Sequence, residues 1–182
     1  MKTPLAQLLL CAACALFAVG AVAEKADRKK PINIESDALR YDDLRQTSVF
    51  SGNVVMTKGS IIIRGAQIEV HQDAEGYQFG VVTAEPGKLA YFRQKLDSGD
   101  DFIEGQSEVI EYDGRNDVVK LMKNAQLRRL RGTALSDEVT GDVIRYYNAT
   151  DVVTVDGAPA KGGDGGRVRA MLTPKSEAAG AA

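Results

Sequence analysis

The fold of this chain is decided by residues 50–56, Phe50-Ser51-Gly52-Asn53-Val54-Val55-Met56. Phe50, Val54 and Met56 share one face of an extended segment, and Ser51 and Asn53 lie on the other. A period of two residues is typical of a half-buried strand. Similar segments follow one another after Pro31, separated by turn sequences at roughly 10- to 15-residue intervals. The pattern predicts antiparallel strands and no helix of useful length after the N-terminal region.

The sequence also contains an internal repeat. Tyr41 and Tyr112 are 71 positions apart, and so are Asn53 and Asn124. The segment that begins at Gly65 is echoed from Gly141, 76 positions later, so that about five residues have been inserted. Repetition of strand units predicts a stacked or coiled β architecture in which each unit buries its apolar face against the next.

Gly65 is expected to lie at a β-bulge. The apolar side chains before it are at odd positions, Ile61 and Ile63, whereas those after it are at even positions, Ile68 and Val70. One extra residue in a strand produces this change of parity.

The ends of the chain predict export. Residues 1–23 combine Lys2, an apolar stretch and the cleavage sequence Ala21-Val22-Ala23, as expected of a signal peptide; a retained anchor is the alternative. Both cysteines of the chain, Cys11 and Cys14, lie in this segment, so the exported protein is expected to have no disulfide. We expect a single domain over residues 24–174 in the exported protein, with residues 24–30 and a tail over residues 175–182 disordered.

Composition argues against nucleic acid as a partner and against catalysis. The formal net charge is −2, which offers no basis for broad nucleic-acid binding. His71 is the only histidine, and no nucleophile elbow, HExxH pair or P-loop is present. We therefore expect no enzyme, no catalytic residue, no metal site and no cofactor. A hydrolase that uses only the carboxylates of Asp42-Asp43 or Asp100-Asp101 is the alternative, although both pairs lie in turn contexts.

The basic cluster Arg128, Arg129 and Arg131 has two interpretations. It is either a solvated strand edge that discourages aggregation or a rim that contacts an anionic head group, because guanidinium groups pair well with phosphate. The sequence does not decide between them.

The apolar faces of the strands likewise have two interpretations. They fill the interior of a closed sandwich, or they line a trough that stays open between two layers and accepts lipid. Periodicity alone does not separate these cases.

A resemblance to a known family covers nearly the whole exported chain. Residues 31–37 and the block Phe50 to Ile61, which contains Phe-x-Gly-Asn-Val, resemble the opening of the OstA-like family. Ile103-Glu104-Gly105, Glu111-Tyr112 and the segments 141–146 and 167–174 resemble its later blocks in the same order. The arginine cluster matches no pattern of the family.

The resemblance implies an all-β fold, a V-shaped and partly open antiparallel β-jellyroll. It also implies transport of lipopolysaccharide across the periplasm, from an ATP-driven inner-membrane complex to an outer-membrane translocon. Members are expected to join end to end, with copies of themselves and with the jellyroll domains of these membrane partners. Residues 32–37 are the candidate edge at one end, and residues 152–155 or 167–172 at the other, because unpaired edge strands accept another chain.

Twelve side chains are predicted to form a groove for the acyl chains of lipid A. They are the inward-facing apolar residues of the alternating segments; Phe92 is included because its segment also resembles a groove strand of the family. The set is Ile32, Ile34, Phe50, Val54, Ile61, Ile63, Ile68, Phe92, Ile110, Tyr112, Leu121 and Ile144. The rival prediction is a structural β-filament or envelope spacer with a filled core and no lipid cargo.

Overall fold

The computed structural model describes residue 27 and residues 29–96, 99–158 and 166–174. Within these residues the chain forms twelve strands, all paired antiparallel. They are β1 (Asn33–Glu35), β2 (Ala38–Asp42), β3 (Thr47–Lys58), β4 (Ile61–Gln72), β5 (Gln78–Thr83), β6 (Ala90–Lys95), β7 (Asp101–Ser107), β8 (Val109–Asp113), β9 (Val118–Arg131), β10 (Ala134–Tyr147), β11 (Val152–Asp156) and β12 (Arg169–Leu172). No helix in the described part of the chain is long and apolar enough to cross a membrane.

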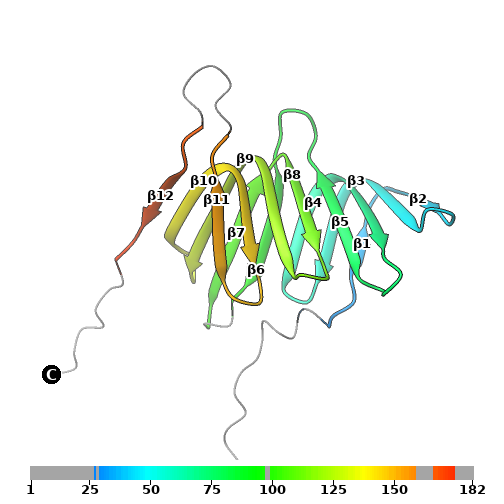
Figure 1. The fold of residues 1–182 in the computed structure, drawn as a ribbon, viewed down its shortest axis with the longest axis horizontal. Helices are drawn as coiled ribbons and strands as arrows, with labels where there is room; N and C mark the ends of the chain where they lie inside the picture. Colours follow the sequence, from blue (N-terminus) through cyan, green and yellow to red (C-terminus); the bar gives the residue numbers. More distant parts are fainter. Residues whose placement is uncertain (1–26, 28, 97–98, 159–165, 175–182) are drawn as a thin grey trace, which may run out of the picture.

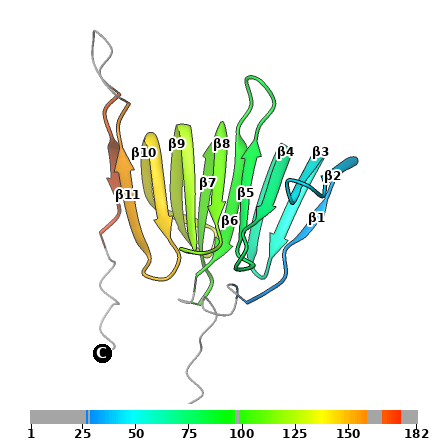
Figure 2. The ribbon, with the colours of Figure 1, turned by 45° about the vertical axis from the view of Figure 1, so that its right-hand side comes forward.

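The strands form two layers. Four long strands, β3, β4, β9 and β10, contribute one half to each layer. Layer A contains β2, β5, β8 and β11 and the halves of the long strands that pair with them. Layer B contains β1, β6, β7 and β12 and the other halves. The strands follow one another from the β1 and β2 end, in blue, to the β11 and β12 end, in orange and red (Figures 1 and 2). The all-β prediction is confirmed.

The long strands β3, β4, β9 and β10 pass from one layer to the other at a common bend. Their pairing register shifts between Ser51 and Val54 in β3 and between Gly141 and Val143 in β10. At the bend of β3, Gly52 and Asn53 have φ of +79° and +47°. Glycine adopts this region freely, and asparagine is the side chain that most often tolerates it. The two layers are therefore joined along one edge and end in separate turns along the other.

Side chains hold this bend in the same way in both halves of the chain. Asn53 donates to the carboxylate of Asp37 at 2.9 Å, and the Asp37 N–H donates to the Gly52 carbonyl at 3.0 Å. At the positions 71 residues later, Asn124 donates to Glu108 at 2.6 Å, and the Glu108 N–H donates to the Lys123 carbonyl at 3.0 Å. The predicted repeat therefore corresponds to two structural units, unit 1 (β1–β6) and unit 2 (β7–β12).

Gly65 does lie opposite the irregularity, and the parity change is confirmed, since Ile63 and Ile68 are both fully buried. The extra residue, however, belongs to β3. The glycine is needed for a different reason, a close approach by β5: a Cβ atom on Gly65 would lie 2.5 Å from Cγ1 of Val82. Gly141 meets Val155 of β11 in the same way, at 2.6 Å.

The expectation of disorder over residues 24–30 is wrong at Asp27, which is buried with 7% of its surface exposed. Residues 24–26 and 28 lie outside the described residues. The Asp27 carboxylate accepts hydrogen bonds from the N–H of Ser60 at 3.0 Å and from the Ser60 hydroxyl at 2.5 Å. Hydrogen bonds from backbone and hydroxyl groups of a turn to an aspartate side chain can fix that residue in place without an apolar core around it. The predicted signal (1–23) and tail (175–182) lie outside the described residues.

Candidate functional site

The space between the two layers brings all twelve predicted groove residues into one apolar cluster. Nine of them are buried, and the other three, Ile32, Ile34 and Phe50, are partly buried against the cluster. The buried nine, each with at most 2% of its surface exposed, are Val54, Ile61, Ile63, Ile68, Phe92, Ile110, Tyr112, Leu121 and Ile144. The predicted faces are therefore right, and their role toward lipid stays a prediction.

The cluster contains further side chains that the prediction left out. They are the other buried apolar residues: Met56, Val82, Ala90, Leu96, Ile103, Val119, Ala125, Leu127 and Tyr146. Several continue the alternation of a predicted neighbour, as Met56 continues Val54 and Tyr146 continues Ile144, and a consistent use of the two-residue period would have found those. Val82 and Ile103 lie in β5 and β7, strands that contain none of the predicted residues.

The two layers touch near the middle of the interior. The rings of Phe92 in layer B and Tyr146 in layer A have centroids 6.4 Å apart and are tilted by 49°. Close to them, Gly105 leaves room for Leu121, whose Cδ1 would lie 2.6 Å from a Cβ at that position. Apolar side chains close on one another when nothing else separates them, since folded interiors pack densely. At these residues the layers are in contact, where the sequence analysis allowed for an open trough.

A buried polar contact joins the two layers near their turns. Lys58, at the end of β3 in layer B, donates to the hydroxyl of Tyr112, at the end of β8 in layer A, at 2.8 Å. Only 5% of Lys58 and 2% of Tyr112 is exposed. A buried ammonium group requires such partners. This contact bridges the edge at which the layers are not joined by the chain, and nothing in the strand pattern signals it.

Burial decreases toward both ends of the stack. At the β1 and β2 end, Leu39 and Tyr41 are exposed by 59% and 56%, and at the β12 end Leu172 is exposed by 72%. A cavity of about 190 Å³ lies beside Leu172, and its lining includes Leu127, Arg129, Val139 and Val153. The apolar interior therefore reaches the surface at the two ends.

The candidate edge segments lie at the ends of the stack. Among the residues that the structure describes, β1 and β11 end the strand order, β2 pairs only with β3, and β12 pairs only with β10. Both candidates for the second edge are therefore correct, because β11 closes layer A and β12 closes layer B.

The arginine cluster is divided between two faces, as its position in β9 requires. Arg128 lies 3.5 Å from the carboxylate of Glu104, which also accepts a hydrogen bond from Arg93 at 2.8 Å. Arg128 also borders the end cavity, which Arg129 lines from the other face of the strand, and Arg131 is exposed at the last position of β9. Arg131 is not among the residues that line this cavity.

The acidic turn residues and the histidine have structural partners. His71 stacks on Phe79 with ring centroids 4.9 Å apart. Asp42 accepts a hydrogen bond from the Arg45 N–H at 3.1 Å, and Asp100 pairs with Lys95 at 3.1 Å. Among the described residues no group of three potential metal ligands gathers.

Arg115 links two turns of the open edge. It donates to Asp73 at 2.8 Å and to Glu75 at 2.8 Å. Desolvation pushes the pKa of Asp73 up, but hydrogen bonds from the Tyr77 N–H and from Arg115 hold it below its ordinary value. Asp73 lies in the turn between β4 and β5, and Arg115 lies in the turn between β8 and β9, so the contact joins unit 1 to unit 2.

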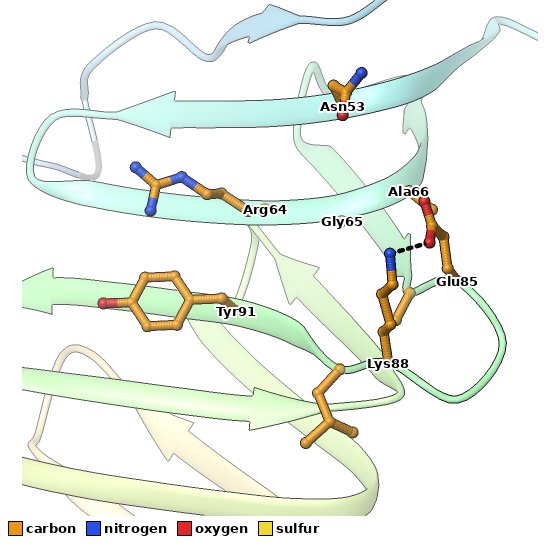
Figure 3. Close-up of a pocket in the computed structure, with 9 residues that line it drawn as sticks. Asn53, Arg64, Gly65, Ala66, Glu85, Lys88 and Tyr91 are labelled. Carbon is orange, nitrogen blue, oxygen red and sulfur yellow. Dashed lines mark ion pairs between the residues drawn. The ribbon is translucent and has the colours of Figure 1, made fainter.

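A second cavity, of about 200 Å³, lies at the bend of unit 1 (Figure 3). Its lining includes Asn53, Arg64 and Tyr91, and the ion pair between Lys88 and Glu85 closes one side (Figure 3). Its charged lining is unsuited to hydrocarbon. The apolar interior is therefore the better candidate for an extended apolar ligand.

Comparison with known proteins agrees with this geometry. Residues 33–152 match the family described as "LptA/(LptD N-terminal domain) LPS transport protein". The chain belongs to this family. The matched range runs from the start of β1 to the first residue of β11 and so includes nearly all of both units of the LptA/LptD N-terminal domain fold.

Individual members of the family are similar to this chain over most of its length. The lipopolysaccharide export system protein LptA of Haemophilus influenzae is 30% identical over 174 residues, which cover 96% of this chain and 95% of that protein. LptA of Escherichia coli K12 is 34% identical over 136 residues, covering 75% and 70%.

The fold of the family is also found in a solved structure. The crystal structure of LptH from Pseudomonas aeruginosa, the LptA-homologous periplasmic component of a lipopolysaccharide transport device, superposes with a TM-score of 0.69. It is 24% identical and covers 82% of this chain and 99% of that one. The predicted β-jellyroll is confirmed.

Proposed function

We propose that this protein is a periplasmic lipopolysaccharide carrier that shields acyl chains between its two β-layers. One observation carries the proposal: a single apolar cluster runs through both repeat units and is only partly covered at each end. Membership of the lipopolysaccharide transport family and the similarity to two lipopolysaccharide export proteins support the same function.

The gain on transfer of an acyl chain is large enough to drive binding. Removing a methylene from water stabilises by roughly 0.8 kcal/mol, so that a twelve-carbon chain gains on the order of 10 kcal/mol. Because the layers touch at Phe92 and Tyr146, an acyl chain passes this point as the layers part. Contacts such as that between Phe92 and Tyr146 are then replaced by contacts with the ligand.

The free edge between the layers is the natural place for this opening. The layers are covalently joined along the bend, whereas on the other side the bridge between Lys58 and Tyr112 holds them together. Rupture of that bridge lets the layers separate without breaking a strand pair. The head group, which is strongly charged, then stays outside.

The carrier works as one link in a bridge. Its edge strands join it end to end to further copies, and to the jellyroll domains of an inner-membrane complex and an outer-membrane translocon, by pairing of unpaired backbone groups. The chain itself performs no catalysis. An ATP-driven partner in the inner membrane supplies the energy.

Photocrosslinking in cells tests the proposal. A photoreactive phenylalanine at position 92 or 112 is expected to label lipopolysaccharide strongly, because both side chains are buried in the interior. The controls are positions 53 and 69, where Asn53 and Glu69 are exposed. Labelling of equal strength at the controls would refute the assignment of faces, and absence of labelling at all four positions would favour the rival, a spacer with a permanently filled core.

A charge at the end of the interior gives a second test. Ile34→Asp is expected to weaken lipopolysaccharide binding at least about tenfold, because a carboxylate beside an acyl chain is costly to desolvate. The side chain is only partly buried, so that folding is retained. Asn33→Asp adds the same charge one position away, on the exposed side of β1, and is expected to bind normally. Equal binding by both variants would contradict the proposal.

A further inference from the structure

The two units of the chain are already joined to each other by a strand junction. β5 of unit 1 pairs with β8 of unit 2 in layer A, and β6 pairs with β7 in layer B. Each unit arranges its six strands in the same way. Consequently β11 and β12 correspond to β5 and β6, and β2 and β1 correspond to β8 and β7.

The strand registers define which residues correspond. In layer A, Val82 pairs with Ile68, and Val155 pairs with Ile144, which is the repeat equivalent of Ile68. Val155 is therefore the equivalent of Val82. On the other side, Leu39 pairs with Phe50 just as Ile110 pairs with Leu121, 71 positions later.

Layer B gives a corresponding pair. Tyr91 faces Arg64 and Arg169 faces Thr140, and these partners are repeat equivalents 76 positions apart. Arg169 is therefore the equivalent of Tyr91. Gln106 of β7, which faces Tyr91 across the internal junction, is the equivalent of Glu35.

The outer edges carry apolar side chains that the internal junction buries. Ile110 and Tyr112 are exposed by 0% and 2%, whereas their equivalents Leu39 and Tyr41 are exposed by 59% and 56%. Large apolar side chains left exposed on an edge strand indicate a partner surface. The fold itself provides the template for that partner.

We propose that two copies of this chain join in the register of the internal junction, with Leu39 of one copy opposite Val155 of the next and Glu35 opposite Arg169. This inference rests on the proposed end-to-end assembly and specifies the partner surface and its register. The second copy thus continues both layers and the apolar interior between them.

The chemistry of the facing residues supports this register. On the inner face of layer B it places Leu172 opposite Ile32, the equivalents of the facing pair Gln94 and Ile103. On the outer face it places the cation of Arg169 opposite the anion of Glu35. Facing opposite charges stabilise antiparallel pairs, and a shift by one residue would exchange the two faces of the strand.

The same correspondence assigns a role to Arg129. It is the repeat equivalent of Lys58, which bonds Tyr112 across the layers, and Tyr41 is the equivalent of Tyr112. Within the described residues no hydrogen bond or ion pair joins Arg129, which lines the end cavity. In the joined state the Arg129 guanidinium reaches the Tyr41 hydroxyl of the next copy, which in the single chain donates to Asp43 at 3.1 Å.

Disulfide trapping tests the register. In a background with Cys11→Ser and Cys14→Ser, the pair Arg40→Cys and Thr154→Cys places thiols at directly facing, outward positions of β2 and β11. Facing Cα atoms in antiparallel strands are about 4.5–5.5 Å apart, within the range that a disulfide spans. Oxidation is expected to produce a ladder of linked copies.

The matched control shifts one partner by two residues, Asp42→Cys with Thr154→Cys, and so stays on the same face. Diagonal neighbours are about 7–8 Å apart, and we expect at least a tenfold slower reaction. A separate variant with Val81→Cys and Glu111→Cys, which face each other across β5 and β8, serves as the reference, and all variants are oxidised until this internal disulfide is fully formed. Absence of a ladder from the register pair at that time, or an equal ladder from the shifted pair, would overturn the register.

A charge exchange gives an independent measurement. Glu35→Arg and Arg169→Glu each place like charges opposite each other and are expected to weaken self-association about threefold, whereas the double variant restores it. Arg129→Ala is expected to weaken association further than Lys88→Ala, which removes the same charge far from both ends. Failure of the double variant to recover would contradict the Glu35 and Arg169 pairing.

Two outcomes separate this inference from the proposed function. If lipopolysaccharide labels position 92 but the register pair does not link, the register is wrong and the carrier function stands. If the pair links in register and no interior position is labelled, the junction stands and the carrier function fails.

Discussion

The internal junction and the outer edges of this molecule are built from equivalent strands with opposite exposure. Ile110 in β8 is fully buried because β5 and the interior cover it, whereas its equivalent Leu39 in β2 is exposed by 59%. The tyrosines two residues later differ in the same way, 2% for Tyr112 and 56% for Tyr41. Burial of these side chains is therefore decided by which strand lies next in the stack and not by the strand's own pattern.

The largest difference in stability is expected when Ile110 and its equivalent Leu39 are each replaced by aspartate. Ile110→Asp buries a carboxylate in the apolar cluster and is expected to cost more than about 4 kcal/mol of unfolding free energy. Leu39→Asp is expected to stay within about 0.5 kcal/mol, as surface substitutions usually do. Urea unfolding at low protein concentration measures both; similar losses would show that the edge is not free in the single chain.

The hydroxyls of the equivalent tyrosines are the next test. Tyr112→Phe removes a hydrogen bond from the buried ammonium group of Lys58 and is expected to cost about 1–3 kcal/mol. Tyr41→Phe removes an exposed hydrogen bond to Asp43 and is expected to change stability by less than about 0.5 kcal/mol. Thermal unfolding of both variants suffices. A cost at Tyr41 that appears only at high protein concentration would sharpen the comparison, because it would locate the effect at the junction between copies.

A smaller effect is expected at the turns of the open edge. Arg115 clamps the turn of unit 1 at Asp73, while its repeat equivalent, Leu44, is 98% exposed. The folded-state pKa of Asp73 lies below the ordinary 3.8. Its contribution to stability is therefore present above the unfolded pKa and is lost as the pH falls through the folded value. In Arg115→Ala, carboxyl NMR titration is expected to show the Asp73 pKa moving back up; no movement would contradict the role of the clamp.

The smallest effect is expected at His71. His71→Ala removes an exposed ring stacked on Phe79 and is expected to leave lipopolysaccharide transport unchanged, with a stability loss of at most about 1 kcal/mol. Cell viability assays with the variant as sole copy provide the measurement. Loss of transport with the fold intact would reopen the possibility of catalysis.

Sequence reasoning located the groove faces well. All twelve predicted side chains belong to one cluster because the two-residue period assigns every side chain of a strand to a face. The 71-residue repeat was equally informative: the pairs Asp37 with Asn53 and Glu108 with Asn124 form the same bend twice. Local patterns of this kind need no knowledge of distant contacts.

The sequence did not predict which polar side chains are buried against a distant partner. Lys58 ends β3 and opens the Lys58-Gly59 turn, where a solvated ammonium group is the normal expectation. Yet Lys58 is buried and bonds to Tyr112, 54 positions later. Asp27 lies in a charged stretch that the composition marks as disordered, yet Ser60 holds it. In both cases the partner comes from a distant segment, and neither local pattern indicates it.

The amino-acid sequence alone determined the strand character, the two faces and the repeat, since these depend on side-chain alternation along the backbone. Only the tertiary structure decided that the layers join at one edge, that Lys58 bridges the other, and that β2 lies exposed where β8 is covered. The physical reason is that exposure is set by neighbours brought from far along the chain. Two segments with the same alternation, Leu39 to Tyr41 and Ile110 to Tyr112, therefore differ by more than half of their surface.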